Sequence, residues 1–297
     1  MMNSSDPPRT DGPRGNNFLG FTNEEARYDK ARVVVVPVAY DATASYKSGT
    51  KYGPAAIIAA SREIESTDRD AGIDLAGVGI ATTDEVEALA DGPAVMVDSV
   101  EREIAAHLSA GKACAMLGGE HSITLGSVRA HKAKFADLTV LQIDAHADMR
   151  DTYQGSKFSH ATTMRRVREI CPVISVGIRS TSSACLQAIN SGKLPVFWAR
   201  DCVGKSDWHE SALAGLSGHV YITFDLDGLD PSIMPAVGTP EPGGLLWYET
   251  LDFLHKIPGR SKIVGFDVVE LMPIPGLHYP DFLAARLVTE LMRMVCA

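Results

Sequence analysis

Cysteine is sparse in this sequence, and the few cysteines form no recognisable framework. Five occur in 297 residues, scattered along the chain, and no C-x-x-C pair is among them. Disulfide scaffolds and zinc ribbons need paired thiols at close spacing, so both are excluded. An odd number of scattered thiols is typical of a reducing compartment, and we predict a cytoplasmic protein.

Long apolar runs and basic clusters are also missing. No run approaches the ~18 apolar residues that cross a membrane, so no membrane partner is expected. The net charge is -9 and no basic stripe exists to neutralise phosphates, which excludes a nucleic-acid partner. Such an acidic surface either favours the approach of a cationic small molecule or serves solubility alone.

The first 17 residues lack the apolar core of a signal peptide. They are rich in Pro, Ser, Asn, Asp and Gly, so residues 1–17 are predicted to form a flexible arm. No linker rich in Pro, Gly or Ser and no internal repeat interrupts residues 18–297, which we interpret as a single domain. The hydrophobic content of the whole chain, 45%, suffices for one large core or two modest ones.

Strand-like and helix-like stretches alternate through this domain. Apolar, often β-branched runs, as expected for parallel strands covered on both faces, alternate with stretches whose apolar residues recur at helical spacing. Repeated βα units without a break predict one three-layer α/β fold with a mostly parallel central sheet. The expected strands are 31–38, 113–117, 138–143, 172–178, 194–198, 219–224 and 263–268, and the expected helices are 54–65, 94–108, 123–131, 162–170, 182–190, 248–256 and 280–295.

Three short motifs rich in acidic residues and histidine each follow a strand-like run. They read G-G-E-H-S at 118–122, D-A-H-A-D at 144–148 and D-L-D-G-L-D-P at 225–231. Side chains alternate on an extended strand end, so D-x-H-x-D sends three ligating groups in one direction. Ligands bind beyond the carboxyl ends of parallel strands, where all three motifs are placed. In the first motif, we expect Ser122 to cap the helix that follows.

The motifs supply two imidazoles and four carboxylates. Six such groups are too many for one ion, and carboxylates at the mouth of a buried strand would repel one another without metal. They suggest two divalent ions, about 3.5–4 Å apart, that share carboxylates and activate a water. A calcium loop is excluded, because its sixth and twelfth positions would be Asp230 and Ala236 instead of Gly and Glu. The candidate ligands are His121, Asp144, His146, Asp148, Asp225 and Asp227.

Together with four further segments in the expected order, these motifs resemble the ureohydrolase family of agmatinases and arginases, most closely its agmatinase-type members. The resemblance covers nearly the whole chain from residue 34 onward. It implies the arginase-like fold and a homo-oligomer, either a trimer or a hexamer. The further segments are G-T-K-Y-G-P at 49–54, S-H-A-T at 159–162, G-T-P-E-P-G-G at 238–244 and F-D-V-V-E at 266–270.

The resemblance implies a division of the ligands between two metal ions, with Asp144 and Asp225 bridging both. It favours manganese, in agreement with a shell of oxygen and imidazole donors without thiolate, while nickel, cobalt and iron stay open. The remaining ligands are divided between the two ions, His121 and Asp148 on one, His146 and Asp227 on the other.

Two residues outside the three motifs also gain roles from the resemblance. His160 follows a polar segment and matches the family's proton-shuttling histidine; the alternative is a histidine of a surface loop. Glu270 ends the last strand-like run and matches the carboxylate that holds the guanidinium, a strong charge-assisted pair. A strand-end salt bridge is its alternative. Asp148 would carry a proton from the attacking water to the departing nitrogen.

The resulting hypothesis is binuclear metal-dependent hydrolysis of a small cationic guanidino substrate to urea and an amine. Agmatine, which gives putrescine in polyamine biosynthesis, is preferred, because the loop 149–154 departs from the arginase pattern. Arg150 and Asp151 are, with Glu270, the candidate substrate-binding residues. Arg150 is unfavourable for an ammonium tail, so it either pairs with Asp151 or another nearby carboxylate, or binds the carboxylate of guanidinobutyrate or guanidinopropionate. N1-aminopropylagmatine and arginine are further alternatives.

A different class of protein also stays open. The chain could be a metal-binding homologue without turnover, or a metal-dependent deacetylase on a related scaffold. Deacetylases of that shape usually hold one metal ion, so a count of bound metal separates them from a binuclear hydrolase.

Overall fold

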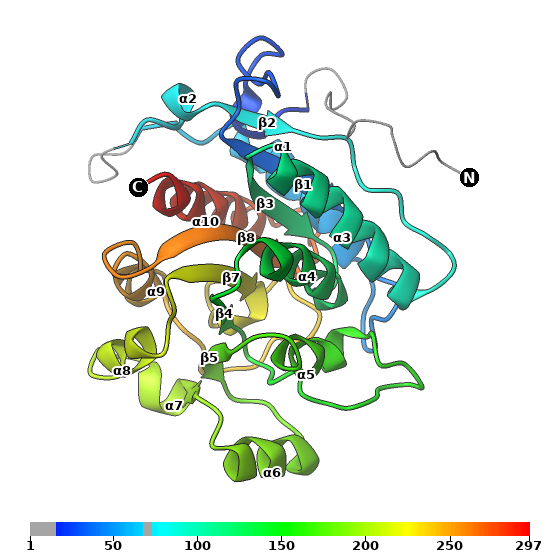
Figure 1. The fold of residues 1–297 in the computed structure, drawn as a ribbon, viewed down its shortest axis with the longest axis vertical. Helices are drawn as coiled ribbons and strands as arrows, with labels where there is room; N and C mark the ends of the chain where they lie inside the picture. Colours follow the sequence, from blue (N-terminus) through cyan, green and yellow to red (C-terminus); the bar gives the residue numbers. More distant parts are fainter. Residues whose placement is uncertain (1–15, 68–72) are drawn as a thin grey trace.

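An eight-stranded, wholly parallel sheet organises the chain (Figure 1). It is seen in a computed structural model that describes residues 16–67 and 73–297. The order of strands across the sheet is β2-β1-β3-β8-β7-β4-β5-β6. The strands are β1 (Val33–Val38), β2 (Ile80–Thr82), β3 (Ala113–Gly118), β4 (Leu138–Ile143), β5 (Val173–Ile178), β6 (Val196–Trp198), β7 (His219–Asp225) and β8 (Lys262–Val269).

Strand β1 shows why the sheet is covered on both faces. All six of its residues are buried, and valine occupies five of the positions. Val33 and Val35 belong to one hydrophobic core, whereas Val34, Val36 and Val38 belong to another. Because side chains alternate along a strand, one apolar run supplies both cores, and each must be closed by a layer of helices.

Helices supply those layers, so the predicted three-layer α/β fold is confirmed. The core on one face receives residues from α1, α8, α9 and α10, and the cores on the other from α3, α4, α5 and α6. The helices are α1 (Gly53–Ser61), α2 (Leu75–Val78), α3 (Pro93–Ser109), α4 (Thr124–Lys134), α5 (Thr163–Arg168), α6 (Ser183–Gly192), α7 (Ala199–Cys202), α8 (His209–Ala214), α9 (Trp247–Leu254) and α10 (Tyr279–Cys296).

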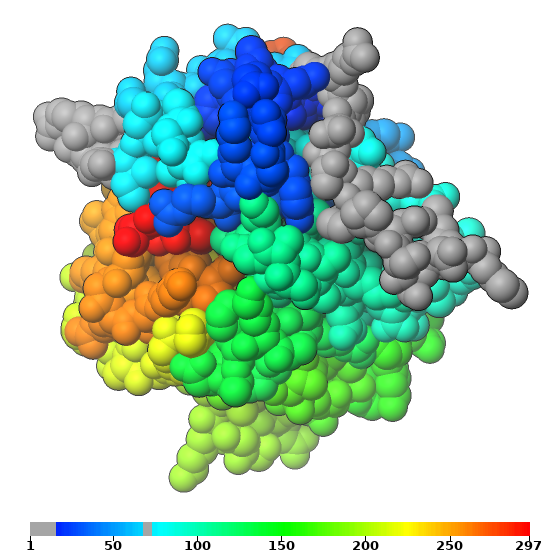
Figure 2. All heavy atoms as spheres, turned by 45° about the horizontal axis from the view of Figure 1, so that its top comes forward, coloured from blue at the N-terminus to red at the C-terminus, as the bar shows by residue number. Residues whose placement is uncertain are grey.

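The first and last α-helices of the described chain lie next to each other. Helix α1 packs on α10, and in the space-filling view the blue N-terminal segment lies beside the red C-terminal helix (Figure 2). Of the predicted arm, residues 1–15 lie outside the described residues. Asn17 is buried and its amide donates to Phe21 O over 2.9 Å. The division at residue 17 stays a prediction.

Several short elements escaped prediction from sequence. Strand β2 has three residues and the helices α2 and α7 have four each, lengths over which no hydrophobic period can be recognised. The expected strand 194–198 begins two residues later, at Val196, because Pro195 precedes it. None of the helices among the described residues is long and apolar enough to cross a membrane.

Candidate metal centre

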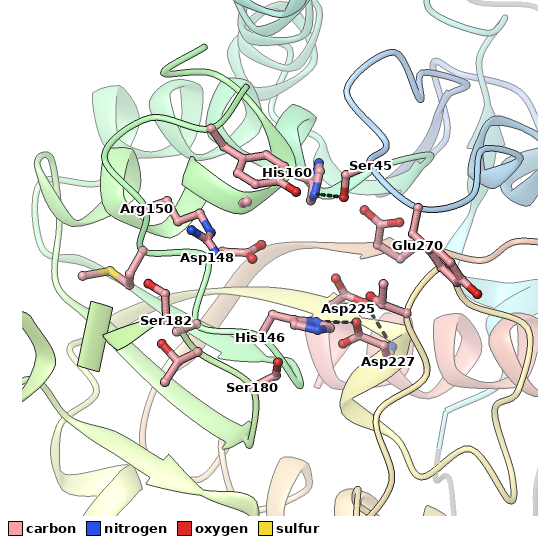
Figure 3. A pocket seen from close by; sticks show the side chains of 18 of the residues that line it. Ser45, His146, Asp148, Arg150, His160, Ser180, Ser182, Asp225, Asp227 and Glu270 are labelled. Carbon is pink, nitrogen blue, oxygen red and sulfur yellow. Dashed lines mark hydrogen bonds and ion pairs between the residues drawn. The ribbon is translucent and has the colours of Figure 1, made fainter. Parts of the chain in front are cut away.

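The carboxyl ends of four neighbouring central strands, β3, β8, β7 and β4, form the floor of the candidate site. Strand β3 ends shortly before His121, β4 ends just before Asp144, β7 ends at Asp225 and β8 ends just before Glu270. Because these strands are parallel and adjacent, their ends meet at one edge of the sheet. Side chains from distant segments therefore converge there, as predicted (Figure 3).

One group of potential ligands surrounds the ring of His121. Its Nδ1 lies 3.0 Å from Asp148 Oδ2, 3.3 Å from Asp144 Oδ2 and 3.4 Å from Asp225 Oδ2. One ligand atom each from His121, Asp144 and Asp225 lie within 4.8 Å of one another. These three residues are buried, so any cation among them is shielded from water.

A second group consists of Asp144, His146 and Asp227, again with ligand atoms within 4.8 Å of one another. His146 Nδ1 lies 2.7 Å from Asp227 Oδ2 (Figure 3). The other oxygen of Asp227 accepts a hydrogen bond of 2.9 Å from the backbone N–H of Ala145. Asp144 is common to both groups. Two ligand groups that share a carboxylate match the arrangement of two-metal hydrolytic sites.

Burial and mutual repulsion shift the pKa values of these groups. Burial, followed by the charges of Asp148 and Asp227, raises the pKa of Asp144 to about 7. Burial and the charges of Asp227 and Asp144 raise the pKa of Asp225 well above its usual range. Burial alone would lower the pKa of His146, but Asp227 and Asp144 raise it to about 11. Carboxylates this close together repel one another, so positive charge between them is stabilising.

The donor atoms fit divalent cations. His121 Nδ1 is buried and has no hydrogen-bond partner among the described residues, although three carboxylates surround it. A nitrogen lone pair that faces carboxylate oxygens is repelled unless a proton or a metal cation lies between them. Oxygen and imidazole donors without thiolate suit manganese and related ions better than structural zinc. The residues present therefore form a candidate metal-binding cluster.

Two residues of the site adopt backbone conformations that are rare outside glycine. Asp148 has φ 48° and Glu270 has φ 69°. Each such residue costs about 1–3 kcal/mol and persists only where its surroundings hold it. The backbone of Asp148 accepts from Arg165 N over 3.2 Å, and Glu270 N donates to Gly119 O over 2.8 Å. These bonds fix both carboxylates at the floor of the site.

The carboxylate of Glu270 is held against the first metal-ligand motif. Its Oε1 accepts a hydrogen bond of 2.7 Å from the backbone N–H of His121. Burial, with a contribution from the charge of Glu120, raises the pKa of Glu270 to about 8. Gly119, whose carbonyl accepts from Glu270 N, lies against the backbone of Tyr40, and a Cβ there would lie 2.1 Å from Tyr40 O. Only glycine can occupy that position.

His160 begins the 3-10 turn η4 (His160–Thr162) and lines the cavity above the floor. Its Nδ1 lies 3.2 Å from Thr43 Oγ1 and its Nε2 lies 3.4 Å from Ser45 Oγ (Figure 3). The hydroxyl of Thr43 donates to the buried carboxylate of Glu120 over 2.6 Å. Tyr153 meets the imidazole edge-on, with ring centroids 5.5 Å apart. The imidazole is therefore held on two sides.

A cavity of about 250 Å³ opens above the metal-ligand groups. Carboxylates form its floor, and aromatic, hydroxyl and basic side chains surround its mouth, so a ligand here meets negative charge at depth. The polar and aromatic lining residues are Ser45, Tyr46, Lys47, His146, Asp148, Arg150, Tyr153, His160, Ser180, Thr181, Ser182, Asp225, Asp227, Thr239 and Glu270.

Arg150 and Asp151, both predicted to bind substrate, lie in different places. Arg150 lines the cavity, and its guanidinium carbon lies 5.2 Å from the centre of the Tyr153 ring, a cation–π contact. Asp151 is not among the residues that line the cavity. It pairs with Arg166 at 2.7 Å, and that partner lowers the pKa of Asp151. The pairing of Arg150 with Asp151 is therefore wrong, because Arg166 of α5 takes the carboxylate.

Ser122 does not cap a helix, and that expectation is wrong. Its hydroxyl donates to the carboxylate of Glu120 instead. A 3-10 turn, η3 (His121–Ile123), comes before α4, which begins at Thr124 and has no side-chain cap at Ile123. The extra turn moves the start of the helix past the serine.

Four further residues support the site and were missed in the sequence. Thr43, Ser45 and Tyr153 contact His160 but lie in segments without a motif. Gln142 lies inside strand β4, donates to Asp144 Oδ2 over 2.8 Å and accepts from Ser175 over 2.7 Å. A glutamine within an otherwise apolar strand was the one available signal, because a buried polar group needs a partner.

With this geometry established, a model of the arginase family matches residues 31–294. This chain belongs to the arginase family. The resemblance to ureohydrolases drawn from the motifs is thereby confirmed.

Relatives within the arginase family cover most of the chain. N(1)-aminopropylagmatine ureohydrolase of a Synechocystis species is 39% identical over 95% of this chain and 94% of its own. Agmatinase of Pyrococcus horikoshii is 33% identical over 81% of this chain and 84% of its own. The crystal structure of agmatine ureohydrolase of Thermoplasma volcanium superposes with a TM-score of 0.83 at 34% identity, covering 91% and 92% of the two chains. The arginase-like fold is confirmed.

Proposed function

We propose that this protein hydrolyses a linear guanidino compound to urea and an amine, with N1-aminopropylagmatine as its substrate and spermidine as the amine. The observation that carries the reaction is that the Glu270 carboxylate lines the same cavity as four of the candidate metal ligands, His146, Asp148, Asp225 and Asp227. The choice of N1-aminopropylagmatine as the substrate is supported by the Synechocystis relative, which bears the name N(1)-aminopropylagmatine ureohydrolase and is 39% identical. Agmatine, preferred from sequence, is the second candidate, since the Pyrococcus horikoshii relative is named agmatinase.

The proposed cofactor is a pair of divalent ions, with Mn²⁺ favoured by the donor atoms. When bound, the ions supply Lewis-acid activation of water near neutral pH, which hydrolysis of an unreactive guanidinium needs. The residues that would hold them are His121, Asp144, His146, Asp148, Asp225 and Asp227.

Three side chains of the chain itself perform the remaining work. The carboxylate of Glu270 binds two N–H groups of the guanidinium and fixes the orientation of its central carbon. A free carboxylate oxygen of Asp148 takes up the proton that water loses and passes it to the departing nitrogen. His160, held by Thr43 and Ser45, delivers the second proton to the released amine. Water adds to carbon, the carbon–nitrogen bond to the tail breaks, and urea and an ammonium product leave.

The cavity mouth offers contacts for an amine-bearing tail. Tyr46 and Tyr153 present aromatic faces, and Ser180 and Ser182 present hydroxyls. Ammonium groups are attracted by aromatic faces and accepted by hydroxyl oxygens. Arg150 already occupies one side of Tyr153, so its cation is tied to a ring.

Urea release from a panel of guanidino compounds tests the proposal. The Mn²⁺-loaded protein is supplied with N1-aminopropylagmatine, agmatine, 4-guanidinobutyrate, 3-guanidinopropionate and arginine. The expected order of kcat/KM places N1-aminopropylagmatine first and agmatine second. Higher kcat/KM for an acidic compound, abolished by Arg150→Ala, would instead make Arg150 a carboxylate-binding residue and overturn the proposed tail.

The proposed setting is a cytoplasmic homo-oligomer, a trimer or a hexamer. Light scattering of the Mn²⁺-loaded protein measures its mass against the 31.8 kDa chain. A mass of one chain at assay concentration would contradict the oligomer and leave the proposed reaction untouched.

A further inference from the structure

A carboxylate that the proposed reaction does not use lies beneath the metal-ligand groups. Asp267 is in the middle of β8 and is 0% exposed. It is absent from the cavity lining, and no lysine or arginine forms a salt bridge with it among the described residues. Burial raises its pKa. A buried carboxylate without a cation is costly, so its hydrogen-bond partners indicate why it is there.

Two hydroxyl groups of the neighbouring strand β7 satisfy Asp267. Thr223, its direct partner across the sheet, donates from Oγ1 to Asp267 Oδ1 over 2.7 Å. Tyr221 donates from its hydroxyl to Asp267 Oδ2 over 2.7 Å. Both residues are 0% exposed. Each hydroxyl has a single proton, and the carboxylate can only accept, so both protons point at Asp267.

The hydroxyl of Thr223 also contacts the candidate metal ligand His121. Thr223 Oγ1 lies 2.9 Å from His121 Nε2. Since the hydroxyl proton is already given to Asp267, the oxygen can only accept from the imidazole. Thr124 Oγ1, the other hydroxyl near Thr223, is farther away at 3.5 Å and does not compete with the shorter bond. Nε2 of His121 therefore carries a proton.

Because Nε2 donates to Thr223, the other ring nitrogen of His121 faces three carboxylates. Nδ1 lies 3.0–3.4 Å from oxygens of Asp148, Asp144 and Asp225. A metal ion needs a bare imidazole nitrogen, and a hydrogen bond donated by the opposite N–H both orients the ring and makes it a stronger donor to metal.

We propose that Asp267, acting through Thr223, is a positioning residue that keeps the proton of His121 on Nε2 and reserves Nδ1 for a metal ion. The inference deepens the metal centre proposed above and rests on it. It assigns a purpose to the buried pair Thr223 and Asp267, neither of which lines the cavity.

The hydrogen bonds from Asp267 through Thr223 to His121 form a relay. The Mn²⁺ affinity of variants at Thr223 and Tyr221 tests this relay. Thr223→Val removes the acceptor of the His121 N–H, and Thr223→Ser keeps it. Tyr221→Phe is the matched control, because it removes an equally short bond to Asp267 without touching His121. Titration calorimetry with Mn²⁺ alone should show affinity reduced about 10–100-fold in Thr223→Val. Thr223→Ser and Tyr221→Phe should stay near the parent. Equal weakening in Thr223→Val and Tyr221→Phe, or none in Thr223→Val, would overturn the proposal.

A second measurement needs no metal and separates the two levels of inference. Long-range ¹H–¹⁵N spectra of the metal-free parent protein report which ring nitrogens of His121 carry protons. Where the ring carries a single proton, its position on Nε2 supports the relay, and its position on Nδ1 overturns the relay. Failure of the parent to bind Mn²⁺, with Nε2 protonated, would remove the proposed metal centre and the purpose assigned to the relay together.

Discussion

Glu270 illustrates at the scale of single residues how the site is held. Its backbone adopts φ 69°, its amide donates to Gly119 O, and its carboxylate accepts from the backbone of His121. The side chain is thus fixed before any substrate arrives. Fixed charges contribute more to binding and orientation than mobile ones, because no reorganisation is needed when the substrate binds.

Glu270→Gln should lower kcat/KM for every guanidino substrate by a similar factor. Glutamine keeps the oxygen that accepts from His121 N, so the backbone contact survives while the charge is lost. The loss of one charge-assisted pair should cost about 1.5–3 kcal/mol in kcat/KM. Comparison of kcat/KM for N1-aminopropylagmatine, agmatine and 4-guanidinobutyrate measures this. A change in preference among tails without a general loss would place Glu270 away from the guanidinium.

His160→Ala should slow turnover and leave the metal content unchanged. The imidazole contacts Thr43 and Ser45 and belongs to neither metal-ligand group. A general acid–base group contributes about 10²–10⁴-fold to the rate. Metal analysis and kcat are measured together, with Ser45→Ala as the control that keeps the imidazole. Unchanged kcat with full metal content would make His160 an ordinary loop residue.

At the scale of elements, one close helix crossing supports the side of the sheet that carries His121. Helices α3 and α4 pack against each other, and Gly126 of α4 lies at the contact. A Cβ at Gly126 would lie 2.4 Å from Val97 O and 3.0 Å from Glu101 N, both backbone atoms that cannot rotate away. The glycine therefore sets the distance between the two helices.

Gly126→Ala should destabilise the protein. The added methyl group forces α3 and α4 apart, and overpacking of this kind costs about 1–3 kcal/mol. Urea unfolding gives the change in the free energy of unfolding. Gly77→Ala in α2 is the control, because a Cβ there meets nothing within 4 Å, and it should be neutral or slightly stabilising. Equal stability of both variants would show that the helices separate at no cost.

At the scale of the whole molecule, metal binding and folding are coupled through the crowded carboxylates. Asp144, with its pKa raised to about 7, contributes stability that is fully present below its usual pKa and is lost as pH rises through about 7. The pKa of about 11 for His146 acts in the same direction at higher pH. The metal-free protein should thus lose stability as its site deprotonates, whereas metal binding requires that deprotonation.

Mn²⁺ should therefore raise Tm, and by more at about pH 8 than at about pH 6, because protons compete with the ions at the lower pH. At an Mn²⁺ concentration of about 100 times Kd, one site adds about 2.7 kcal/mol to the free energy of unfolding. Calorimetric melting with and without chelator measures the shift, and metal analysis should find about two ions per chain. Asp225→Asn should bind fewer and show a smaller shift. Saturation at one ion would contradict the binuclear centre.

The class of fold and the candidate ligands could be predicted from the sequence, because both depend on local pattern. Apolar runs that end in D-x-H-x-D or D-x-D mark buried strands whose last side chains are polar, and both signals lie within a few neighbouring residues. The order of the strands across the sheet could not be predicted from the sequence. That order places β8 and β7 between β3 and β4, and it brings Glu270 to His121, 149 positions earlier.

The pairing of the supporting residues, in contrast, depends on the three-dimensional fold. Asp151 is next to Arg150 in sequence but pairs with Arg166, and Ser122 turns to Glu120 instead of capping α4. The partners of His160 come from a loop more than 100 positions away. Hydrogen bonds between side chains depend on distance in space and on direction, and neither is encoded in local composition. Strand ends could therefore be predicted from local pattern, whereas the contacts that orient each imidazole and carboxylate required the fold.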